Sequence, residues 1–258
     1  MRQWIRYSCM ALIWACLVGA IANTRADNAL AVAPLPPDVG VDGIDQPELT
    51  ARWWRWVLHA PIAPYLDPDG RICDYGQEGP VWFLAGTEGS GVVRRRCVMP
   101  SGKYLLFPVI NMVYMQVQPT REHPTRMSCA KLQARASANN DNLVSAVVLV
   151  DGVAVQDVRR YRVQTPHCFP LTVDARGEAT DGALLAASDG YWLLLPPLPA
   201  GHHVIVVGAN YGSKDRPYGN MIQDFQYDLD VGGVTILSGV PKDAGCPSMP
   251  GCARVPRR

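Results

Sequence analysis

The apolar residues between positions 45 and 58 recur with the period of an α-helix. Asp45 is a suitable N-cap, Pro47 and Glu48 suit the first turn, and Pro61 lies beyond the last turn. The stripe that would face a core consists of Leu49, Trp53, Trp56 and Val57. The pattern therefore predicts a short helix from Asp45 to about Leu58, rich in tryptophan.

From residue 80 onward the pattern changes to that of strands. The run "PVWFLAG" is continuously apolar, as expected for a strand covered on both faces. The segment "GVVRRRCVMP" follows a Gly-rich turn, and we expect it to pair back on the first strand. Pro108 lies inside the long run "YLLFPVINMVYMQV" and predicts a bulge, a bend or an edge position.

Further strands are predicted in the second half of the chain, and only "SCAKLQARASANN" has the pattern of another short helix. The strand-like runs are "VSAVVLVDGVAV" with an Asp-Gly turn, "RYRVQTPHCFPLTV", "GYWLLLPPLPAGHHVIVVGANYG" and "FQYDLDVGGVTIL". Strands of modest length between Pro/Gly turns favour a mainly β fold. We predict an antiparallel β-sandwich, jelly-roll-like or immunoglobulin-like, with the Trp-rich helix packed on it.

The first 26 residues have the order of a secretory signal peptide, with a basic start, an apolar run and small residues before the cleavage site. The run is shorter than the ~20 residues that a membrane-spanning helix needs. We therefore expect cleavage and a secreted or periplasmic protein without a transmembrane segment. The predicted organisation is a signal peptide at 1–26, an extended arm at 27–44, one β-sandwich domain at 45–238 and a loose tail at 239–258.

Six of the eight cysteines lie beyond this leader: Cys73, Cys97, Cys129, Cys168, Cys246 and Cys252. An even number in an exported chain favours disulfides. Their order along the chain suggests that neighbours pair, although sequence alone leaves many pairings open. The pair Cys73–Cys97 is the firmest prediction because the two residues flank the expected hairpin.

A set of motifs resembles a family of exported bacterial proteins that has no assigned activity. The motifs are Trp54-x-Trp56, Asp67-Pro68-x-Gly70, Cys73, Gln77, "VWFLAG", Arg95-x-Cys97-x-x-Pro100, Gly102-Lys103 and "FPVIN", followed by "VDGVAV", "YRV" and "DGYWLLLPPLPAGHHVIVV". The likeness covers most of residues 50–231, and the chain departs from the pattern in "VVRRRC" and in its Cys246/Cys252 tail. The resemblance implies a secreted β-rich fold and no particular substrate.

Charge and motifs exclude several function classes. The formal net charge is +1 with scattered Lys and Arg, so nothing indicates a nucleic-acid surface. His202 and His203 are neighbours in a predicted strand and would point to opposite faces, which disfavours a shared metal. The sequence has no Gly-x-Ser-x-Gly elbow. We therefore expect no metal and no cofactor.

The tryptophans have two interpretations, a platform for sugar rings or a wedge that closes a core. A stripe at helical spacing favours the core, so Trp53 and Trp56 are predicted to be buried. Trp54 lies off the main stripe and is the candidate for ligand contact.

Polar residues beside the apolar strands supply the other candidates for a ligand site: Gln77, Arg95 and Asn111. They would meet near Trp54 if their strands are adjacent, and such a site would suit a polar ligand such as a glycan or a carboxylate. The alternative is that they satisfy backbone groups near bulges and loops. The sequence favours a non-catalytic binding or envelope-associated protein over an extracytoplasmic hydrolase with a carboxylate-based site, and leaves open whether the protein is an enzyme.

Overall fold

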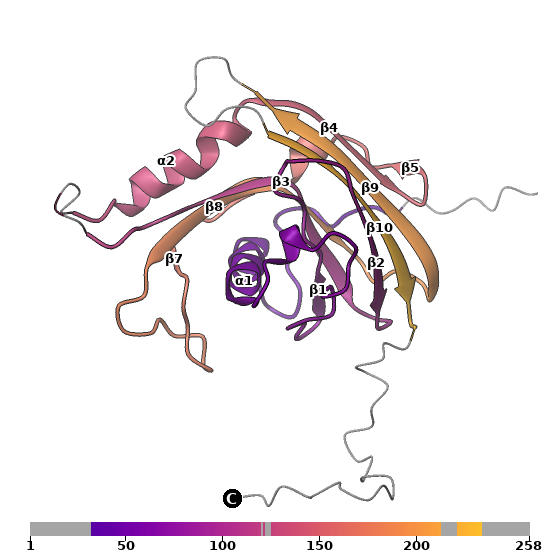
Figure 1. Ribbon diagram of the computed structural model, residues 1–258, viewed down its shortest axis with the longest axis horizontal. Helices are drawn as coiled ribbons and strands as arrows, with labels where there is room; N and C mark the ends of the chain where they lie inside the picture. Colours follow the sequence, from indigo (N-terminus) through magenta and orange to yellow (C-terminus); the bar gives the residue numbers. More distant parts are fainter. Residues whose placement is uncertain (1–31, 120, 122–124, 213–220, 234–258) are drawn as a thin grey trace, which may run out of the picture. The chain divides into compact units, whose positions relative to one another are not determined.

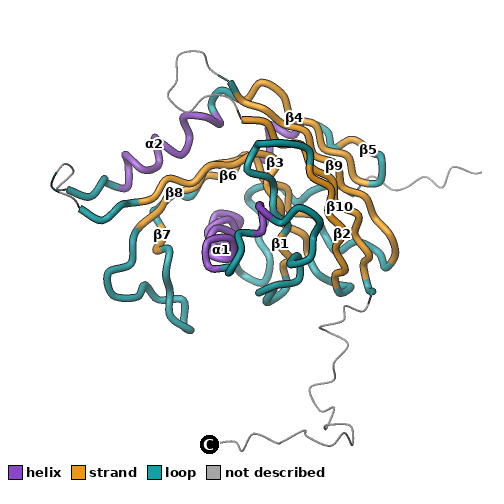
Figure 2. Tube along the Cα trace, in the orientation of Figure 1, coloured by secondary structure: helices purple, strands orange, loops and turns teal. Residues whose placement is uncertain are grey.

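The computed structural model describes residues 32–119, 121, 125–212 and 221–233, and this part of the chain is mainly β. One sheet has the order β1-β3-β8-β6, with β7 also paired to β8, and the other has the order β2-β10-β9-β4-β5 (Figure 1, Figure 2). The first sheet comprises β1 (Val81–Phe83), β3 (Tyr104–Met115), β8 (Leu185–Leu195), β6 (Arg162–Gln164) and β7 (Phe169–Pro170). The second comprises β2 (Val93–Met99), β10 (Met221–Val231), β9 (Gly201–Tyr211), β4 (Leu143–Val150) and β5 (Val153–Ala154).

Two α-helices and two 3-10 turns complete the described part. They are α1 (Gln46–His59), α2 (Cys129–Asn140), η1 (Pro64–Leu66) and η2 (Val158–Tyr161). Neither α-helix is long and apolar enough to cross a bilayer.

Apolar residues on the two faces of the first sheet form two cores. One core lies between the sheets and includes Phe107, Leu193 and Phe225, all buried. The other lies between the first sheet and α1 and includes Leu106, Trp192 and Leu194. The mainly β sandwich with a Trp-rich helix, predicted from the hydrophobic pattern, is confirmed, and α1 adds a third layer below the first sheet (Figure 1).

The predicted pairing of the first two strands is wrong. β1 pairs in parallel with β3, and β2 pairs in parallel with β10 in the other sheet, so the sandwich is not purely antiparallel. The physical reason is the glycine-rich segment 84–92, which crosses between the sheets and does not turn back on β1. Consequently Arg95 on β2 and Asn111 on β3 belong to different sheets.

Local signals in the other strands are confirmed. The register of β3 against β8 shifts between Pro108 and Ile110, which is the bulge that the proline predicts. Asp151 and Gly152 both have positive φ, as a two-residue hairpin turn between β4 and β5 requires. The second predicted helix is α2, and Ser128 caps it by accepting from Lys131 N.

Helix α1 begins as predicted, because Asp45 Oδ1 accepts a hydrogen bond of 2.8 Å from Glu48 N. Its three tryptophans tie it to three other segments by indole N–H bonds of 2.8 Å. Trp53 donates to Leu84 O, Trp54 to Ser188 Oγ and Trp56 to Tyr75 O. The tryptophan cluster is therefore mainly architectural.

The ranking of the tryptophans by burial differs from the prediction. Trp53 is 2 % exposed, as expected, and its ring meets that of Trp192 edge-on at 5.2 Å. Trp54, the candidate for ligand contact, is also buried at 9 %, whereas Trp56 is only half-buried. The two rings have different surroundings: the indole of Trp54 bonds to Ser188 on β8, whereas that of Trp56 bonds to Tyr75 in a loop.

The described part of the chain contains two disulfides. Cys73–Cys97 has a Cα–Cα distance of 5.9 Å and Cys129–Cys168 one of 5.7 Å, both within the ordinary range. The pairing of sequence neighbours is thus confirmed for these four cysteines. Cys246 and Cys252 lie outside the described residues, as do the leader at 1–26 and the tail at 239–258.

Trp53→Ala should lower the free energy of unfolding by ~3–5 kcal/mol, the usual cost of a large aromatic truncation in a core. Trp56→Ala should cost less, ~1–2 kcal/mol, because the ring is already partly in water. Urea denaturation of both variants measures the difference. A loss for Trp56→Ala equal to that for Trp53→Ala would contradict the assignment of Trp53 as the central aromatic.

Candidate functional site

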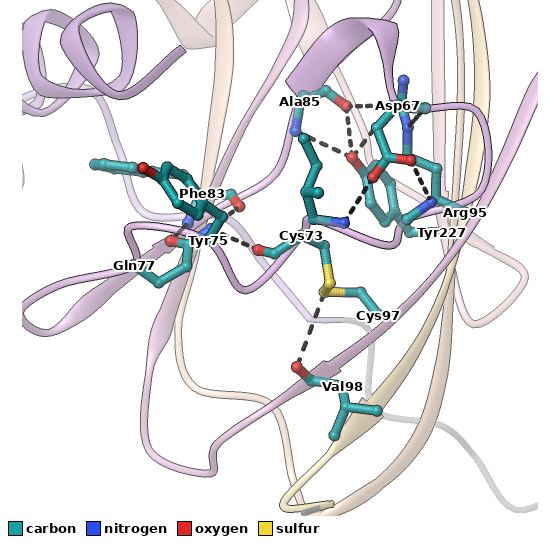
Figure 3. Close-up of a disulfide and its surroundings, with 12 residues drawn as sticks. Asp67, Cys73, Tyr75, Gln77, Phe83, Ala85, Arg95, Cys97, Val98 and Tyr227 are labelled. Atoms are coloured by element: carbon teal, nitrogen blue, oxygen red, sulfur yellow. Dashed lines mark hydrogen bonds between the residues drawn. A yellow bond between two sulfur atoms is a disulfide. The ribbon is translucent and has the colours of Figure 1, made fainter. Parts of the chain in front are cut away.

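Gln77 is engaged with the backbone. Its Nε2 donates to Cys73 O at 2.9 Å and to Phe83 O at 2.8 Å, and its Oε1 accepts from Phe83 N at 2.9 Å (Figure 3). The side chain thus pairs with the end of β1 as a neighbouring strand would. It has no group directed toward a ligand.

Arg95 is a buried guanidinium, 1 % exposed, that donates to the backbone on every side. The acceptors are the carbonyl oxygens of Tyr65 at 3.0 Å, Asp67 at 2.6 Å, Ala85 at 3.0 Å and Gly86 at 2.8 Å, and the hydroxyl of Tyr227 at 3.2 Å. Tyr227 in turn donates to Ala85 O at 3.0 Å (Figure 3). Arg95 therefore joins three segments, 65–67, 85–86 and β10.

The carboxylate of Asp67 supplies a negative charge near this guanidinium, although only the backbone carbonyl of Asp67 bonds to it. Its carboxylate accepts from the backbone N–H groups of Asp69, Gly70 and Ile72. Burial acts to raise the pKa of Asp67, but these backbone bonds and the charge of Arg95 outweigh it and lower the pKa below its ordinary value. The acidic stretch "DPDG" is thus a turn.

Gly70 lets this turn lie against β2. It has φ of +92°, and a Cβ there would lie 2.2 Å from Arg96 O. Asp69 O also accepts a hydrogen bond from Arg96 N at 3.0 Å, and the Cys73–Cys97 disulfide links the same turn region to β2.

Asn111 and Trp54 come together at a cavity of about 220 Å³ that we call the tryptophan cavity. It is lined by Trp53, Trp54, Leu58, Tyr65, Gly86, Thr87, Glu88, Asn111, Met112, Val113, Met115 and Met221. The lining comes from α1, η1, the 84–92 crossing segment, β3 and the start of β10. Of the four predicted ligand residues, the structure brings two to this cavity and places Gln77 and Arg95 in backbone contacts outside it.

The polar groups of the tryptophan cavity are few. Asn111 Nδ2 is buried and has no hydrogen-bond partner within the described part of the chain. Thr87 is held to Gln223, because Thr87 N donates to Gln223 Oε1 at 2.7 Å and Gln223 Nε2 donates to Thr87 O at 2.8 Å. Glu88 is exposed at the mouth. The cavity therefore has mainly apolar walls and one lining residue with an unpaired amide donor, close to the usual composition of a small-molecule site.

The bulge in β3 determines that Asn111 reaches this cavity. Ile110, after the register shift, packs in the core between the sheets, so Asn111 turns to the α1 side of the first sheet. Gly190 on β8 makes room for it, since a Cβ there would lie 2.6 Å from the Cβ of Asn111.

The paired histidines lie elsewhere, on β9. His202 contacts Asp230 at 3.2 Å, and His203 contacts Asp151 at 2.7 Å, so the two rings have separate partners. Among the described residues, no three His, Cys, Asp or Glu side chains gather as a metal site would require.

Sequence reasoning missed Tyr65, Thr87, Met112, Met115 and Met221 as lining residues. Methionine and threonine in apolar strands carry no signal of a cavity. The wall of the cavity also combines residues from both sheets. Predicting it therefore requires the strand order, which the sequence alone does not specify.

Arg95→Met should lower the free energy of unfolding by ~3–5 kcal/mol, because it leaves buried carbonyl oxygens without donors. Arg94→Met is the matched control on the same strand: Arg94 is exposed, so the change should stay within ~0.5 kcal/mol. Guanidinium denaturation measures both. Equal, small losses would show that Arg95 is not the structural centre described above.

Comparison of the sequence with protein-family models finds no match, and comparison with curated proteins finds none either.

Proposed function

We propose that the protein is an exported, non-catalytic binding protein whose ligand is a small, mainly apolar molecule with a hydrogen-bond acceptor. The observation that carries the proposal is the buried Nδ2 of Asn111, a donor without a described partner at the wall of an apolar cavity. Leaving such a group unpaired costs free energy in folding, and an acceptor on a ligand would recover it.

Export is supported by the basic, apolar, small order of the first 26 residues and by the two disulfides, which are typical of oxidising compartments. The motifs shared with the exported bacterial family support membership of that family, which we include in the proposal.

The polar side chains that line the cavity favour binding over hydrolysis. Carboxylate-based glycoside hydrolysis uses two carboxyl groups that face each other across the substrate. Among the described residues that line the tryptophan cavity there is one carboxylate, Glu88, and that group accepts a hydrogen bond of 2.7 Å from Ser90.

The proposal predicts how two matched probes bind. Acetophenone carries a carbonyl acceptor, and ethylbenzene has a similar size without one. Acetophenone should bind the wild-type protein roughly 2–10-fold more tightly, as one net hydrogen bond provides. An NMR titration that follows the indole N–H signals, with Trp54→Phe to assign the Trp54 signal, measures both affinities.

Asn111→Leu should remove the preference for acetophenone and raise the free energy of unfolding by about 1 kcal/mol, since it replaces a buried unpaired amide with an apolar group of similar shape. Val113→Phe should abolish binding of both probes by filling the cavity. Val117→Phe is its control, because Val117 is exposed and outside the cavity. If Asn111→Leu destabilises the protein and leaves the probe preference unchanged, Asn111 is structural and the proposal fails.

A further inference from the structure

A second hollow lies on the solvent side of α1, away from the tryptophan cavity, and we call it the α1 cleft. Its volume is about 500 Å³, and its walls are the outer residues of α1, the segment 76–83 and the loop 173–177. The loop after β7 runs below α1 in Figure 1, which is how its tip reaches this position. Nothing in the function proposed above uses the cleft.

Trp56 gives the α1 cleft a fixed aromatic wall. Its Nε1 donates to Tyr75 O at 2.8 Å, and its ring lies 5.7 Å from that of Phe83, which also lines the cleft. Gly76 packs against the edge of the indole, where a Cβ would lie 3.5 Å from Cδ1. The ring is half-buried, so part of it remains accessible, and its position is set before any ligand arrives.

Charged side chains of both signs line the same cleft in equal number: Arg52, Arg55, Arg176, Glu48, Glu78 and Asp174. Glu48 Oε1 accepts from Arg52 Nε at 3.1 Å and from Arg55 Nη1 at 3.0 Å. On the opposite wall, Arg176 and Asp174 form a pair at 3.1 Å. The formal charges of the lining cancel.

Several of these groups retain hydrogen-bonding capacity. Both bonds to Glu48 end on Oε1, which leaves Oε2 for another donor, and Arg52 uses only its Nε in the described part of the chain. Glu78 forms no ion pair with the described residues. The cleft thus offers donors and acceptors side by side, whereas an anionic ligand would be repelled by the carboxylates of Glu48, Glu78 and Asp174.

We infer that the α1 cleft binds a neutral carbohydrate, with the apolar face of one sugar ring against Trp56 and its hydroxyls bonded to Arg52, Glu48 and Glu78. A hydroxyl both donates and accepts, so it matches a lining of alternating carboxylates and guanidinium groups. The cleft volume is within the range of small-molecule sites. This site is separate from the tryptophan cavity and does not depend on the function proposed for it.

Four trisaccharides test the inference by isothermal titration calorimetry with the full mature chain. They are cellotriose, maltotriose and triacetylchitotriose, which are neutral, and trigalacturonic acid, which is anionic. At least one neutral sugar should bind with a Kd of about 1 mM or tighter, and trigalacturonic acid should bind roughly 10-fold more weakly or not at all.

Two substitutions in the cleft should weaken binding of that sugar. Glu78→Gln and Arg52→Gln should each raise its Kd ~10-fold, because each removes a charged hydrogen-bonding group. Arg71→Gln is the control, since Arg71 is exposed and pairs with Asp69 outside the cleft. Thermal unfolding shows that each variant is folded.

Three results would overturn the inference. They are no binding of any neutral sugar, tighter binding of trigalacturonic acid than of the neutral sugars, and binding by Glu78→Gln and Arg52→Gln equal to that of Arg71→Gln. Failure here leaves the acetophenone result at the tryptophan cavity unaffected, so the two sites are judged separately.

Discussion

The buried guanidinium of Arg95 is the constraint on which this structure depends. One side chain satisfies four backbone carbonyls from segments outside the two sheets, and it bonds to Tyr227 of β10. A charged group at 1 % exposure is costly unless its donors are matched, and the ionised carboxylate of Asp67 nearby compensates part of the charge. The Cys73–Cys97 disulfide fixes the same region covalently, so this edge of the sandwich is held by two independent means.

This arrangement determines where the tryptophan cavity lies. Tyr65 and Gly86 give their carbonyls to Arg95 and also line the cavity, so the guanidinium positions two parts of its wall. Trp53 fixes the opposite wall through its bond to Leu84 O in the same crossing segment. Among the described residues that line the cavity, Asn111 is the one whose buried polar atom has no hydrogen-bond partner. Binding sites in proteins commonly lower the stability of the fold at one residue. Interactions elsewhere in the structure then compensate for that loss.

Much of the fold followed from the sequence because it depends on local chemistry. The cap at Asp45, the helix stripe, the bulge at Pro108 and the Asp151–Gly152 turn each require only a few neighbouring residues. The parallel pairing of β1 with β3 could not be predicted, because it depends on a crossing segment whose direction no local pattern specifies. The site shows a related limit. Gln77 and Arg95 were singled out as candidate ligand residues, but Gln77 bonds to the backbone of Cys73 and Phe83, and Arg95 bonds to carbonyl groups of two loop segments whose position the sequence does not specify.

The central claim is that Asn111 donates to a ligand acceptor inside the tryptophan cavity. A crystal structure of the protein soaked with acetophenone tests it most directly. The account predicts the phenyl ring against Trp54 and the carbonyl oxygen about 3 Å from Asn111 Nδ2. Acetophenone bound elsewhere, or an empty cavity in which Asn111 Nδ2 donates to another side chain or to the backbone, would contradict it.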